Sequence, residues 1–229
     1  MRDYLIFDGI NSKDFHVYLS DAKQFEGAQK VYERKKIPGR SGDLVFSDGS
    51  YENVDIEYNF YLLGDTVTDL DAFRGALISR EGYIRLEDTL RPDEYRMGIM
   101  TSPFDIDSSD RKNASFDITF SCKPQRYLKD GELKHTFTTA GMIQNPTYFA
   151  SKPLIRAYGT GTLTIGNKSC TISSGSVTDI DSDVMDAYYG TENRNGCFSG
   201  DFPALVPGKN KVSFTGFTKI EIVPRWWKI

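Results

Sequence analysis

Side chains able to do catalytic or metal chemistry are few in this sequence and stand far apart. The two histidines, His16 and His135, lack the second histidine or the glutamate that zinc hydrolases carry on the same helix. The three cysteines, Cys122, Cys170 and Cys197, form neither a C-x-x-C pair nor a disulfide framework, so we expect free thiols in a reducing cytoplasm. The spacing predicts no catalytic centre, no metal site and no cofactor, and we expect no enzyme activity.

Two stretches look like ligand loops, but each lacks a required residue. Gly159-Thr160-Gly161 has neither the third glycine nor the following helix of a dinucleotide-binding loop, and we interpret it as a hairpin turn. The acidic run Asp179–Asp186 has Val184 where a calcium loop needs glycine. We therefore expect a strand edge that runs into a polar loop.

Aromatic side chains offer a different chemistry, because their rings can stack on sugars or pack against a protein partner. The candidates in the C-terminal half are Tyr188, Tyr189, Trp226 and Trp227. Adjacent tryptophans on a strand point to opposite faces, so we expect one in the core and the other exposed. A carbohydrate-binding module for host cell-wall saccharide is accordingly an alternative function.

The elements that position these residues are mostly strands. Apolar residues alternate with polar ones over 54–62 and again over 116–122, which is typical of strands buried on one face. Shorter runs of the same kind occur at 4–7, 15–19, 83–86, 95–100, 154–158, 163–165, 211–214 and 217–223. One helix is predicted over residues 69–80, because Thr68 and Asp71 resemble a capping box and Leu70, Phe73, Leu77 and Ile78 share one face.

Composition and charge suggest two domains. Residues 1–130 hold 18 Lys+Arg and 24 Asp+Glu, whereas residues 131–229 hold 10 and 8. The net charge of -4 argues against a nucleic-acid-binding surface. We expect a mainly β chain, with an α+β N-terminal domain over 1–130 and a β-sandwich or jelly roll over 131–229. No apolar run approaches the roughly 18 residues that span a bilayer, so we expect neither membrane insertion nor an export signal.

A basic run followed by a Pro-Gly turn stands out between the strands of the first half. Such a long, charged, glycine-hinged excursion is how a β domain can reach a neighbouring subunit. We expect the contact between subunits at Arg34, Lys35, Lys36, Pro38, Gly39, Arg40 and Gly42.

Several of these motifs occur in the order found in the distal tail proteins of siphophages, a baseplate hub component. The chain resembles this family in the opening Phe7–Phe15, the turn Ile37–Gly42, the strand Tyr51–Leu63 and the segment Phe116–Pro124. In the second half it is similar at Asn145–Ile155, Asp179–Ser182, Pro207–Asn210 and Ile222–Trp227. Pro146-Thr147 departs from the family, which usually has a glycine there.

The resemblance implies a structural virion protein. It implies a ring-forming N-terminal domain with a helix and an extended belt, and a galectin-like C-terminal β-sandwich. Six copies would form a ring in the phage tail tip, between the tail tube protein and the tail-associated hub protein, after synthesis in the host bacterial cytoplasm. The C-terminal domain would carry a receptor-binding protein in some members. DNA would pass through the ring without specific binding, and the acidic first half would disfavour its retention.

Overall fold

The computed structural model describes residues 2–22, 27–102, 106–110 and 112–229. The chain divides into two compact units: unit 1 runs to Arg126 and includes Ile229, and unit 2 is Tyr127–Lys228. The division falls four residues before the expected position at 130/131. The segment after Tyr127 is held by unit 2, since the Leu128 amide donates to the Trp226 carbonyl at 2.9 Å and Gly131 lies against the Trp226 backbone.

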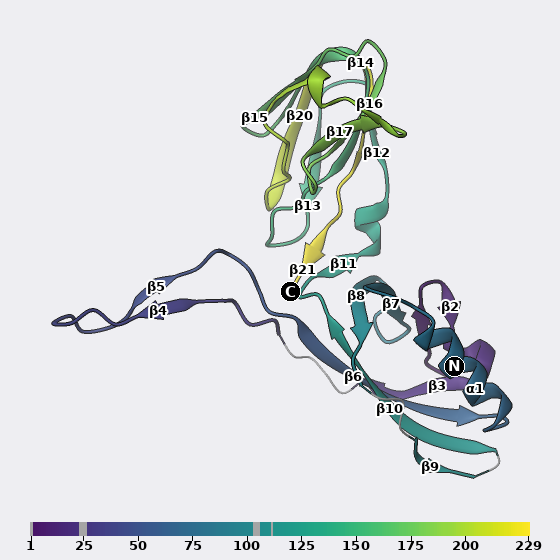
Figure 1. Ribbon diagram of the computed structural model, residues 1–229. Helices are drawn as coiled ribbons and strands as arrows, with labels where there is room; N and C mark the ends of the chain where they lie inside the picture. The colour runs from purple at the N-terminus through teal and green to yellow at the C-terminus, as the bar shows by residue number, and fades with distance from the viewer. Residues whose placement is uncertain (1, 23–26, 103–105, 111) are drawn as a thin grey trace. The chain divides into compact units, whose positions relative to one another are not determined.

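Unit 1 is built on one antiparallel sheet in the order β2-β1-β7-β8-β10-β6-β3, with β9 beside β10 (Figure 1). Its elements are β1 (Leu5–Phe7), β2 (Ile10–Asn11), η1 (Ser12–Phe15), β3 (Val17–Ala22), β6 (Val54–Leu63), α1 (Thr68–Ile78), β7 (Ile84–Asp88), β8 (Glu94–Met100), β9 (Ile106–Ser109) and β10 (Asn113–Cys122). The strands predicted in this half are present. Phe15, expected at a strand start, instead ends the short 3-10 helix η1.

The two alternating stretches pair with each other over ten residues, from Asn113 opposite Leu63 to Cys122 opposite Val54. Alternate side chains of both strands are buried, as the period of two predicts. Helix α1 covers this face through Phe73, which is fully buried and whose ring lies 5.8 Å from Phe60 and 6.1 Å from Phe116. The helix therefore closes the apolar core of unit 1.

The start of α1 differs from the expected capping box. Thr68 is the first helical residue rather than its cap, and the Asp65 carboxylate accepts hydrogen bonds from the amides of Val67 and Thr68, both at 2.9 Å. The carboxylate thus satisfies amides that have no partner within the helix. Helix α1 ends at Ile78, two residues before the predicted end, and Ile78, expected on the buried face, is 50% exposed at this last turn.

Unit 2 is a β-sandwich whose two halves share their longest strands. Its elements are β11 (Arg126–Leu128, beginning in unit 1), η2 (Lys129–Glu132), β12 (His135–Phe137), β13 (Gly141–Asn145), β14 (Leu154–Ile165), β15 (Lys168–Ile172), β16 (Val177–Asp181), β17 (Asp186–Tyr189), β18 (Glu192–Asn193), η3 (Asn195–Cys197), β19 (Phe198–Gly200), β20 (Gly208–Val223) and β21 (Trp227–Lys228). The first half of β14 pairs with β16, and its second half pairs with β15. Likewise, β20 pairs with β13 near its start and with β12 near its end.

The hairpin turn predicted at Gly159-Thr160-Gly161 is wrong, because β14 continues through it and bends. The register between β14 and β20 shifts between Tyr158 and Gly159 and again before Thr162. A Cβ on Gly161 would collide with the Thr215 carbonyl oxygen. The glycines let two backbones approach closely at the bend, so each long strand passes from one half of the sandwich to the other.

Candidate assembly surfaces

A two-stranded arm, β4 (Glu33–Lys35) and β5 (Leu44–Phe46), carries the residues predicted to contact another subunit. Glu33 lies opposite Phe46. In the described part of the chain, each of these strands pairs only with the other, as a ribbon separate from the main sheet (Figure 1). A two-stranded ribbon with no layer behind it is marginally stable in water. The arm therefore has little to fix its conformation within one chain.

The tip of the arm is a tight turn. The Arg40 amide donates to the Ile37 carbonyl at 3.2 Å, and Gly39 has a φ of 79°. Proline followed by a left-handed glycine is the signature of a type II turn, so Pro38 and Gly39 shape the backbone. Gly42, with a φ of 85°, has a similar role. The four cations of the set are all exposed: Arg34, Lys35, Lys36 and Arg40.

The arm also exposes apolar side chains that the sequence analysis did not single out. Val45 is 52% exposed and Phe46 50%, and Val31, Tyr32 and Ile37 are exposed as well. Phe46 and Val45 lie on opposite faces of the ribbon because they are neighbours in a strand. The available signal was the continuous apolar run Leu44–Phe46, which does not alternate as a half-buried strand would.

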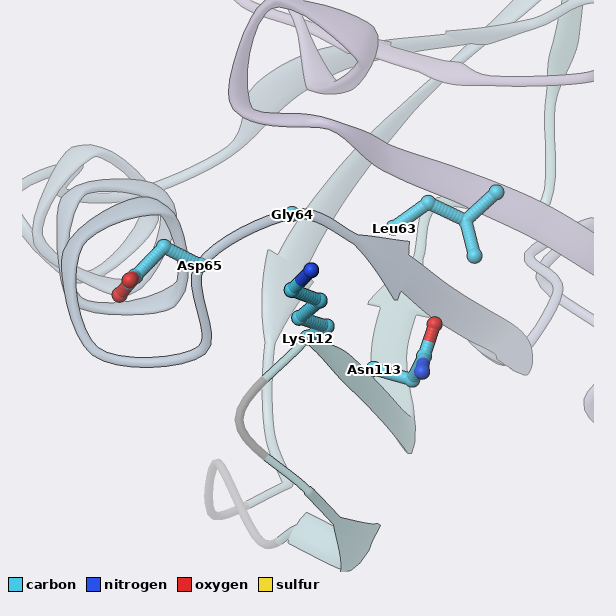
Figure 2. Close-up of a pocket in the computed structure, with 5 residues that line it drawn as sticks. All are labelled: Leu63, Gly64, Asp65, Lys112 and Asn113. Atoms are coloured by element: carbon cyan, nitrogen blue, oxygen red, sulfur yellow. The ribbon is translucent and has the colours of Figure 1, made fainter.

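An open cavity of about 430 Å³ lies where β6 ends and β10 begins. Figure 2 shows its lining residues, Leu63, Gly64, Asp65, Lys112 and Asn113, with the Lys112 side chain between those of Asp65 and Asn113 in this view. The Gly64 amide donates to the Lys112 carbonyl at 3.1 Å and ties the two strand ends together. Leu63 is 38% exposed and gives the cavity an apolar wall. The segments 63–65 and 112–113 are distant in sequence and meet only because β6 and β10 pair in this register. The sequence pattern therefore did not indicate the cavity.

The face of β6 and β10 that points away from the core is acidic. Asp55 and Glu57 on β6 lie opposite Ser121 and Thr119 on β10, and Asp117 lies opposite Asn59. Neither strand carries a lysine or arginine on this face. These two adjacent strands therefore carry three acidic residues and no basic one.

The four aromatic candidates of unit 2 do not all offer an accessible ring. Trp226 is 3% exposed and belongs to the core, so it cannot serve as a stacking surface. Trp227 stacks on Phe149 with ring centroids 4.5 Å apart, and its indole N–H donates to the Ala150 carbonyl. Tyr188 is half-buried, and burial together with Asp181 and Asp179 raises its pKa. Of the four, Tyr189 at 45% exposure has the most accessible ring.

Charged side chains on the outer face of the unit 2 sheet are paired with one another. Arg156 on β14 forms two hydrogen bonds to Asp179, at 2.6 and 2.8 Å, and Arg225 forms two to Asp181, at 2.7 and 2.9 Å. The predicted strand is present and runs into a turn at 182–185, but it is not an edge strand, because β16 lies between β14 and β17. Both aspartates are buried, at 4% and 7% exposure, beneath arginine side chains that compensate their charge.

Glu221 on β20 is the centre of a second ionic group. Its carboxylate accepts hydrogen bonds from Lys219 at 2.8 Å and Tyr158 at 3.1 Å, and pairs with Lys134 at 3.1 Å. These partners, Lys219 above all, lower the pKa of Glu221 to about 2. The buried carboxylates Asp179, Asp181 and Glu221 are thus each paired with a cation of the same unit.

The histidines and cysteines of the chain belong to different segments of the structure. The described residues contain no group of three or more His, Cys, Asp or Glu able to hold a metal ion. His16 is exposed and its Nδ1 lies 3.0 Å from Asp69, while His135 is exposed on β12. All three cysteines are free, and burial raises the pKa of Cys122 to about 12 and that of Cys170 to about 11. Across the same ranges, no helix has the length and apolar character needed to cross a bilayer.

Comparison with known proteins finds similarity to phage tail proteins in sequence and in fold. The model of the phage tail protein RIFT-related domain matches residues 10–122, which lie in unit 1. A comparison of the sequence with curated proteins finds no match. Among solved structures, the Dit protein (gp 19.1) of phage SPP1 matches with a TM-score of 0.76 and 14% identity over 100% of both chains. That protein is described as a paradigm of the hub adsorption apparatus in phages that infect Gram-positive hosts. The predicted resemblance to the distal tail proteins is thus confirmed: residues 10–122 match the phage tail protein RIFT-related domain, and the whole chain has the fold of a distal tail hub protein.

Proposed function

We propose that six copies of this chain form a ring at the tail tip, between the tail tube protein and the tail-associated hub protein. The observation that carries the proposal is the β4–β5 arm, which exposes apolar side chains without a core of its own. Contiguous exposed apolar surface marks a protein interface. If the arm of each copy binds a different surface on the next copy, the contact is head-to-tail. Such contacts close into a ring when the rotation from one copy to the next adds up to a full turn.

The channel of this ring would let DNA pass without holding it. We infer that the acidic outer face of β6 and β10, with Asp55, Glu57 and Asp117, lines the channel. Carboxylates repel the phosphate backbone, whereas lysine and arginine would bind it by releasing its counterions. DNA would therefore cross the ring without a preferred stopping point.

The proposed position in the tail also suggests roles for unit 2 and for the chain as a whole. Unit 2 would face outward and carry receptor-binding parts, and the chain would act by docking rather than by catalysis. Synthesis would take place in the host bacterial cytoplasm before incorporation into the virion.

Mass in solution and electron microscopy of tails test the ring. A hexamer of a 25.9 kDa chain is readily distinguished from a monomer. Replacing Arg40 with glutamate should raise the concentration needed for half-assembly about tenfold, since it reverses a charge at the contact. Lys209→Glu makes the same charge change on an exposed residue of unit 2 and should leave assembly unchanged. A chain that stays monomeric at high concentration and forms no ring in tails would refute the proposal.

A further inference from the structure

One face of the arm has a simple chemical pattern. Phe46 lies opposite Glu33, and the next residue on that face of β4, Lys35, lies opposite Leu44. Directly opposite residues in an antiparallel pair share a face, as do residues two apart in a strand. The face therefore presents an exposed aromatic ring beside one anion and one cation.

The cavity at the ends of β6 and β10 has the complementary pattern. Its apolar wall is Leu63, and its charged lining residues are the cation Lys112 and the anion Asp65. The Asp65 carboxylate is held in place by the α1 amides that it caps. An adjoining hollow that shares Leu63 and Asn113 adds the acidic residue Asp110. The described lining of the two hollows thus includes both signs of charge, whereas cations outnumber acids from Glu33 to Asp43 in the arm.

We propose that the arm of one copy docks in this cavity of the next copy, with Phe46 against Leu63. Glu33 then faces Lys112. The inference rests on the proposed ring, because it names the surface that receives the arm. The contact joins two different sites, and so it is of the head-to-tail kind that builds a closed ring. It also covers an exposed leucine and an exposed phenylalanine in one step.

Cysteine cross-linking tests this pairing directly. A full-length chain with Phe46→Cys and Leu63→Cys, in a Cys197→Ser background, should form a ladder of disulfide-linked species up to the hexamer on mild oxidation. Cys122 and Cys170 are buried and can stay. The matched control pairs Phe46→Cys with Ile78→Cys, since Ile78 is 50% exposed at the far end of α1. The control should yield no ladder.

Charge exchange gives a second readout. Lys112→Glu should raise the concentration for half-assembly about tenfold, and adding Glu33→Lys should restore it. If rings assemble but cross-linking does not exceed the control, or if Glu33→Lys does not restore assembly, the proposed docking site is wrong. The proposed ring would not be contradicted by either result. Absence of any ring in wild-type tails would refute the proposed function, and the docking site with it.

Discussion

Glu221 makes the stability of unit 2 depend on pH. Its ion pair with Lys219, aided by Lys134 and Tyr158, lowers the pKa of the carboxyl from 4.5 to about 2. Because the folded-state pKa lies below the unfolded value, this contribution is complete above the unfolded pKa and is lost as the pH falls toward 2. We expect the urea midpoint to drop over that window. Tryptophan fluorescence reports it, since both tryptophans belong to unit 2.

The Glu221→Gln variant should be less stable at pH 7 and show a smaller drop in midpoint between pH 4.5 and 2. Glu192→Gln serves as control, because the Glu192 side chain is 67% exposed in its pair with Arg194 and exposed pairs contribute little. Equal pH profiles for wild type and Glu221→Gln would contradict the prediction.

At the scale of the element, the bend shared by β14 and β20 depends on glycine. Gly161→Ala would place a methyl group against the Thr215 carbonyl, and the required backbone shift should cost about 2–3 kcal/mol of unfolding free energy. Gly196→Ala is the control, because a Cβ there meets no atom within 4 Å. Urea unfolding followed by tryptophan fluorescence compares the two, and equal losses would show that the bend tolerates a side chain.

The arm should be the least protected strand pair in the free chain. Its hydrogen bonds are exposed and no layer covers them, so local opening needs little free energy. Hydrogen exchange followed by mass spectrometry should show rapid exchange over 33–46 in dilute protein and slow exchange in assembled tails. Slow exchange in the dilute monomer would mean that the arm is stable without a neighbour.

Local patterns predicted the elements well wherever one face of a strand or helix is buried. The alternation over 54–62 and 116–122 and the stripe of Leu70, Phe73 and Leu77 depend only on period, and the structure confirms them. The bend at Gly159–Gly161 could not be predicted, because its cause is the approach of Thr215, distant in sequence. The cavity around Leu63 and Lys112 was missed for the same reason, and the exposed Phe46 resembles a core residue in sequence.

At the scale of the whole molecule, the two halves of the sequence differ in net charge, and this difference leads to a test of the proposed channel. The proposed lining carries Asp55 and Asp117 on adjacent strands. Rings with Asp55→Lys and Asp117→Lys should assemble but retain duplex DNA at low salt and release it as salt rises, since added lysines release counterions. A gel-shift assay checks this against wild-type rings, which should leave DNA free. Retention by wild type would show that the channel does not repel DNA.

The exposed apolar side chains of the arm also explain why the addition of copies to the proposed ring would end at a fixed number. In an open chain of copies, the first has an empty cavity and the last an uncovered arm, so every incomplete assembly keeps one apolar pair in water. Closure removes both at once, and the final contact forms within one particle, where the effective concentration of the two ends is high. Partial rings should therefore be scarce at equilibrium, and ring closure would order the one arm that still lacks a neighbour.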